Sequence, residues 1–140
     1  MRFSEETIDL ILDIKEFSGG KLKNEFELSA LIEFTHTNKS DISFNDIIFK
    51  AKFLKGLAKV MAVSVESKEN SEKFMTEYTT ELKKLTELIQ KGLQKSDPLI
   101  LNTFKNKYFD LTPESFINMN FLIEDLSVCK DYFNDKRNSK

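Results

Sequence analysis

The chain has 140 residues, of which 40% are hydrophobic and 31% charged, and its formal net charge is −2. This length suits one domain with a substantial core. The near balance of charges excludes the basic excess of a general nucleic-acid-binding protein. With 4 Gly and 2 Pro the chain has too few turn residues for an all-β fold, whereas its 13 Phe can fill a helical core.

The only cysteine, Cys129, excludes an internal disulfide and any cysteine-based zinc cluster. Its helical spacing from Leu122, Leu126 and Phe133 predicts a buried, inert thiol. The first residues turn acidic before any apolar run, so no signal peptide is predicted, and no uninterrupted apolar span of membrane length follows. We therefore expect a cytoplasmic protein that does not enter the membrane.

The first helix is predicted over residues 5–17, with Ser4 as its N-cap and acidic side chains in its first turn. Gly19 and Gly20 are predicted to end it, because glycine accepts the left-handed geometry of helix C-termini. The polar face of this helix carries an acidic row, which consists of Glu5, Asp9, Asp13 and Glu16.

Residues 24–36 are ambiguous between a helix and a strand. Asn24 and Glu27 have the spacing of a capping box, which favours a helix. Apolar residues also alternate at period 2, which is typical of a strand. No second strand is evident to satisfy the backbone groups of a lone one, so a helix is the prediction.

Two helices in series are predicted at residues 44–66 and 71–94, joined by residues 67–71; one continuous helix is the alternative. Ser43 and Asp46 favour a start at residue 44. The first of the two is apolar around most of its circumference, which is typical of a helix that neighbours cover. Its polar remainder is a lysine row, which consists of Lys52, Lys55 and Lys59.

Asp97-Pro98 and Thr112-Pro113 predict two further helix starts, because proline suits the first helical position. The last helix is predicted to run to residue 133, followed by a polar tail at residues 134–140. The predicted fold is therefore an all-α, compact bundle of five or six helices in a single domain, residues 1–133, around the central apolar helix at about residues 44–66.

The charged rows are the first candidate sites. The acidic row could bind a divalent cation or a basic partner, but the Glu-x-x-His spacing of di-metal bundles is absent, so we expect a solvated face and no metal or other cofactor. The acidic row could also complement the lysine row, within the fold or across a dimer. The lysine row lacks the interleaved exposed aromatics of nucleic-acid sites.

Catalytic candidates are weak. His36 is the only histidine, and no sequence spacing supplies it with an oriented nucleophile or carboxylate. A pairing of Cys129 with His36 would require a reactive thiol, which a buried cysteine rarely provides. No phosphate loop, dinucleotide fingerprint or nucleophile elbow is present. The sequence therefore predicts a protein that is not an enzyme.

The last helix carries two apolar stripes. One is predicted to enter the core, and the second is a candidate interface with another chain; the alternative is that both meet the core. The second stripe consists of Ile117, Phe121, Val128 and Tyr132. Because a symmetric dimer is the commonest way to cover such a surface, we expect a non-enzymatic interaction or regulatory module that pairs with itself or with another protein.

Two other hypotheses remain open at this point. A Phe-rich bundle could enclose an apolar cavity and bind a small molecule, although core packing explains the same phenylalanines. A metal-dependent enzyme that uses the acidic row is the third hypothesis.

Overall fold

The computed structural model describes residues 2–38, 41–63, 68–110 and 112–138, and it contains six helices and no strands in this part of the chain. The elements in chain order are α1 (Glu5–Phe17), α2 (Glu25–Leu31), the π-helical segment η1 (Ile32–Thr37), α3 (Phe44–Val63), α4 (Lys68–Gly92), α5 (Pro98–Phe104), the π-helical segment η2 (Lys105–Phe109) and α6 (Pro113–Asn138). The predicted all-α class is confirmed.

Both ends of α1 follow the prediction. The Ser4 side chain accepts a hydrogen bond from the Thr7 backbone N–H and so caps the helix. Gly19 and Gly20, which follow the C-cap Ser18, adopt positive φ angles of 68° and 80°. Residues with a Cβ rarely adopt this backbone conformation, so the glycine pair lets the chain turn sharply towards α2.

The helical prediction for residues 24–36 is confirmed, but the predicted capping box is wrong. Asn24 precedes α2, but its side chain accepts no capping hydrogen bond from the first turn of the helix. Its side-chain oxygen instead accepts hydrogen bonds from the Lys107 ammonium and the Tyr108 hydroxyl, both at 2.9 Å. Glu27 also binds Lys107, at 3.3 Å. Partners from η2 therefore hold both side chains.

Asp125 of α6 binds the backbone that leads into α2. Its carboxylate is 2% exposed and accepts the N–H groups of Lys23, at 3.1 Å, and Asn24, at 2.7 Å. Burial raises the pKa of this carboxyl, although the two N–H groups favour its charged form. Asp125 thus ties the start of α2 to the middle of α6.

Glu33 makes the corresponding link for α1. Its carboxylate accepts hydrogen bonds from the Ser4 backbone N–H, the Ser4 hydroxyl and the Thr7 hydroxyl. Burial would raise the pKa of Glu33, but these hydrogen bonds outweigh it and hold the pKa below its ordinary value. The start of α1 is therefore fixed to η1.

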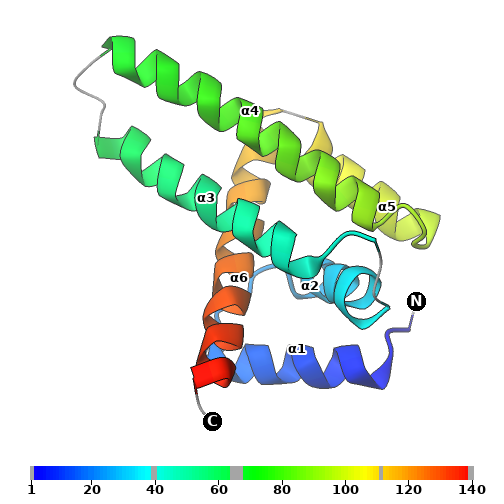
Figure 1. Ribbon diagram of the computed structural model, residues 1–140. Coiled ribbons are helices and arrows are strands. Elements are labelled where there is room, and N and C mark those ends of the chain that lie inside the picture. Colours follow the sequence, from blue (N-terminus) through cyan, green and yellow to red (C-terminus); the bar gives the residue numbers. More distant parts are fainter. Residues whose placement is uncertain (1, 39–40, 64–67, 111, 139–140) are drawn as a thin grey trace.

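α3 and α4 are separate helices, which confirms the prediction of two helices in series. They pack against each other as an antiparallel pair, visible in Figure 1 as the turquoise and green ribbons. The predicted end of the first helix near residue 66 lies outside the described residues. α4 begins at Lys68, so Ser71 lies within the helix rather than before it.

The last two predicted helix starts are confirmed. The Asp97 carboxylate accepts the Leu99 N–H at 2.9 Å, and the Thr112 hydroxyl accepts the Ser115 N–H at 3.2 Å. α6 continues to Asn138, beyond its predicted end at residue 133. It crosses the α3–α4 pair and reaches α1 at its far end, as Figure 1 shows.

The core lies where α3, α4 and α6 meet and extends towards α1 and α2. The predicted apolar face of α4 supplies Tyr78, Leu82, Leu85, Ile89 and Leu93, and the first stripe of α6 supplies Met119, Leu122, Ile123, Leu126 and Cys129. α3 contributes Phe44, Ile47, Ile48, Ala51, Leu54 and Leu57. α3 thus packs against both α4 and α6, but the prediction that neighbours cover most of its circumference is wrong, because one apolar face of the helix stays exposed.

Candidate interaction surface

The uncovered face of α3 carries four exposed apolar side chains and a glycine. This α3 stripe consists of Phe49, Phe53, Gly56, Val60 and Val63, spaced by alternating steps of four and three residues. Phe49 is 68% exposed and Phe53 47%. Steps of four and three residues keep these positions on one helix face, over about 21 Å at 1.5 Å per residue.

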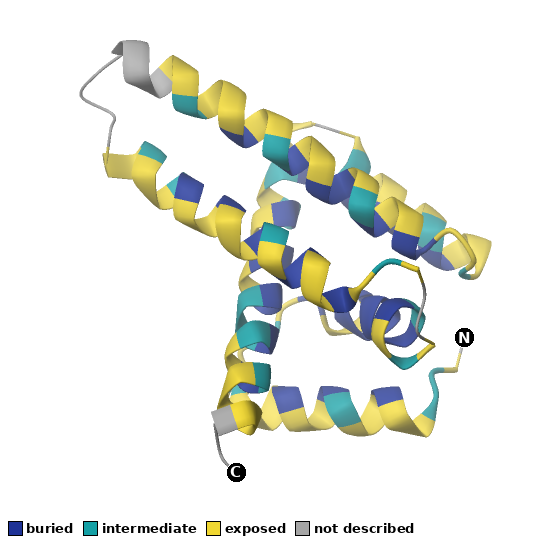
Figure 2. Cartoon of the chain, viewed as in Figure 1, coloured by how far each residue is buried: buried dark blue, intermediate teal, exposed yellow. Residues whose placement is uncertain are grey.

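Scattered exposed apolar residues are normal on a protein surface, but an apolar row along one helix face is typical of a contact surface. Exposed residues, drawn in yellow, run along much of α3 in Figure 2. The apolar character of most of this helix predicts these side chains in the core, and the structure leaves them exposed. The signal that could have singled them out is their heptad-like spacing directly beside the lysine row.

Gly56 lies in the middle of the α3 stripe. A glycine inside a helix costs about 1 kcal/mol relative to alanine. A Cβ at Gly56 would meet no atom within 4 Å, so no described neighbour requires the glycine. A glycine at such a position suits a surface to which another chain comes close.

The lysine row runs along one edge of the α3 stripe, because each of its members directly precedes a stripe residue in the sequence. Lys52, Lys55 and Lys59 are exposed and line a hollow of about 190 Å³ together with Gly56, Ser127, Lys130 and Asp131. The pKa of the Lys130 ammonium is lowered mainly by a side-chain hydrogen bond with Lys52, and desolvation and the repulsion between the two like charges add to this effect. This edge therefore favours a negatively charged neighbour.

The acidic row belongs to α1, a helix that Figure 1 shows apart from α3. All four of its carboxylates are exposed, and Asp13 accepts a hydrogen bond from the Tyr132 hydroxyl at 3.4 Å. Two exposed apolar residues, Ile8 and Leu12, lie beside this row. α1 thus presents a second amphipathic surface, of opposite charge to that of α3.

The two charged rows do not neutralise each other within the described chain. The ion pairs among the described residues are Lys15–Glu25, Lys23–Glu124, Lys84–Glu81 and Lys107–Glu27. None of them joins α1 to α3. Of the two pairings left open by the sequence, the one within the fold is therefore absent from the described residues.

The second stripe of α6 does not form one continuous exposed surface. Ile117 and Phe121 are exposed, and the Lys23 ammonium lies 4.6 Å from the centre of the Phe121 ring. Val128 is half-buried. Tyr132 is only 6% exposed and packs against Phe17, with ring centres 5.7 Å apart. Half of the predicted interface stripe therefore packs inside the fold.

The residues that could suggest catalysis lie in ordinary structural positions. His36 is exposed and packs beside the rings of Phe44 and Phe133. Cys129 is fully buried, and burial raises the pKa of its thiol. In the described part of the chain, no group of three or more His, Cys, Asp or Glu side chains is arranged to hold a metal ion.

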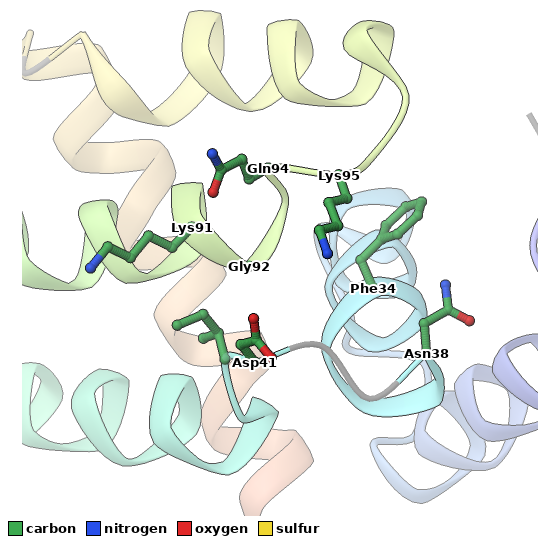
Figure 3. A pocket seen from close by; sticks show the side chains of 8 residues that line it. Phe34, Asn38, Asp41, Lys91, Gly92, Gln94 and Lys95 are labelled. Atoms are coloured by element: carbon green, nitrogen blue, oxygen red, sulfur yellow. The ribbon is translucent and has the colours of Figure 1, made fainter.

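A hollow of about 460 Å³ lies at the end of α4, between this helix, η1 and the residues just before α3. Figure 3 shows its lining side chains. They are Phe34, Asn38, Asp41, Ile42, Lys91, Gly92, Gln94 and Lys95. Five of these eight residues are polar or charged, whereas pockets for small molecules are lined mainly by apolar and aromatic side chains.

Comparison with known proteins adds no assignment. A scan against models of protein families, a search of curated proteins and a search of solved structures found no match. None of the helices in the described ranges combines the length and the apolar character that crossing a bilayer requires.

Proposed function

We propose that this chain is a non-enzymatic protein-interaction module that works in the cytoplasm and associates with a second copy of itself. The observation that carries the proposal is the α3 stripe, an exposed apolar row bordered by lysines on a helix whose other side is core. Covering such a row with a partner removes apolar surface from water, which is the main driving force of most protein association.

Gly56 and the charge distribution support a second copy as the occupant. Gly56 leaves room for the close approach of another helix. The chain itself carries both an apolar–basic surface on α3 and an apolar–acidic surface on α1, so two copies are complementary to each other. The net charge of −2 opposes their approach only weakly.

Phe53→Glu tests this proposal. A carboxylate in the centre of the contact would be buried without a partner, so we expect the dissociation constant to rise by about 100-fold. Analytical size-exclusion chromatography with light scattering should then give one chain per particle for the variant and two for the unmodified protein. Helicity and the melting temperature of the monomer should not change, because Phe53 is exposed.

Two further variants locate the contact. Leu99→Glu introduces the same charge at a 68% exposed apolar position on α5 and should leave the dimer intact. Phe121→Glu introduces it on α6. If Phe121→Glu dissociates the dimer and Phe53→Glu does not, the interface lies on α6 and the assignment to α3 is wrong. A monomeric protein that sediments with anionic lipid vesicles would overturn self-association and assign the face to a membrane surface.

A further inference from the structure

The α1 surface has the chemistry that the α3 surface requires in a partner, and this determines how two copies would meet. The α3 stripe has a basic edge, and the apolar pair Ile8 and Leu12 has an acidic edge. α1 has 13 residues and so spans about 20 Å, close to the length of the α3 stripe. A helix of this length and polarity is the kind of ligand that an exposed apolar helix face binds.

The acidic residues of α1 and the lysines of α3 recur at the same spacing. Asp9 and Glu16 are seven residues apart on α1, and Lys52 and Lys59 are seven residues apart on α3. Seven residues correspond to about 10.5 Å of helix in both cases, so two ion pairs can form at the same time.

The charged residues also lie on the sides of the two helices that would face each other in a parallel pair. Lys52 and Lys59 precede the stripe residues Phe53 and Val60, whereas Asp9 follows the apolar Ile8. In a parallel pair of helices, the residues that directly precede the apolar contact positions of one helix lie opposite the residues that directly follow those of the other helix. A parallel arrangement therefore places lysines opposite carboxylates. A direct pairing of α3 with α3 of a second copy in the antiparallel sense would place lysines opposite lysines instead.

We propose that α1 of one copy docks on the α3 stripe of a second copy, with Asp9 and Glu16 facing Lys52 and Lys59, and that a symmetric dimer contains this contact twice. This inference rests on the proposed self-association and adds the identity of the partner surface. Because both surfaces belong to every chain, the contact needs no other protein.

Charge reversal on each helix tests the docking. One variant carries Lys52→Glu and Lys59→Glu, and the other carries Asp9→Lys and Glu16→Lys. Each should weaken self-association on the order of tenfold or more, because attraction between the facing side chains becomes repulsion. An equimolar mixture of the two variants should associate again, since α1 and α3 are then of opposite charge in both contacts of the mixed dimer.

Native mass spectrometry of the mixture distinguishes the mixed dimer from the two self-pairs when one variant is isotope-labelled. Circular dichroism and thermal unfolding of each variant check that the exposed substitutions leave the fold intact. If the charge variants self-associate as the unmodified chain does, or if the mixture gains nothing over its components, the α1–α3 docking is wrong. Should Phe53→Glu still dissociate the dimer in that case, self-association through α3 stands and only the partner surface is overturned.

Discussion

Replacing Asp125 by alanine is expected to lower the free energy of unfolding by about 3 kcal/mol, because the N–H groups of Lys23 and Asn24 would lose their buried acceptor. The Asp125 carboxylate is 2% exposed, so water cannot easily take its place. Urea denaturation followed by far-ultraviolet circular dichroism measures the change, with an unchanged slope if the variant remains two-state.

Glu124→Ala is the matched control. Glu124 is the neighbouring carboxylate on α6 and pairs with the Lys23 ammonium at 2.7 Å, but both side chains are about half exposed. Exposed ion pairs contribute little, so this change should cost less than about 1 kcal/mol. If the two variants lose equal stability, the buried hydrogen bonds of Asp125 do not hold α2 to α6.

Gly92→Ala is expected to destabilise the fold, by about 2 kcal/mol, although alanine favours helices more than glycine does. A Cβ at Gly92 would lie 2.8 Å from Cγ2 of Thr35. Thr35 is buried, and its hydroxyl donates a hydrogen bond to the Leu31 carbonyl. The threonine therefore cannot turn away without losing that bond, and η1 and α4 would have to separate.

Gly56→Ala on α3 is expected to stabilise the fold, in contrast to Gly92→Ala. Its Cβ would meet nothing, so the variant should gain about 1 kcal/mol from helix propensity alone. Both glycine variants are best measured by urea denaturation in the Phe53→Glu background, where association does not contribute. Stabilisation by Gly92→Ala would contradict the close packing of α4 against η1, and destabilisation by Gly56→Ala would contradict the open space around Gly56.

The helix starts could be predicted from the sequence because their signals are local. Ser4, Asp97 and Thr112 accept backbone N–H groups within their own first turns, as their residue types and positions indicate. The buried face of α4 was also predictable, because its apolar residues recur at helical spacing.

The contacts of Asn24 and Glu27 could not be predicted in the same way. Their spacing indicates a capping box, but Lys107 and Tyr108 bind these side chains from 80 or more residues away. The partner of the α2 backbone, Asp125, is likewise distant in sequence. Which long-range polar partner displaces a local cap depends on the packing of the helices, which local spacing does not encode.

The exposed face of α3 likewise could not be predicted from local spacing. Apolar residues surround most of α3, so periodicity alone cannot tell which side its neighbours leave open. α4 and α6 cover the side of Ala51 and Leu54, and Phe49 and Phe53 are left exposed. On α6, by contrast, α1 reaches Tyr132 and buries part of the stripe that the pattern favoured as an interface.

Sedimentation equilibrium of the unmodified chain, over concentrations from micromolar to several hundred micromolar, tests self-association most directly. Self-association through complementary surfaces predicts a mass that rises with concentration from one 16.3 kDa chain to two. It also predicts weaker association in high salt, because exposed charge pairs are screened. A mass of one chain at every concentration would contradict the account.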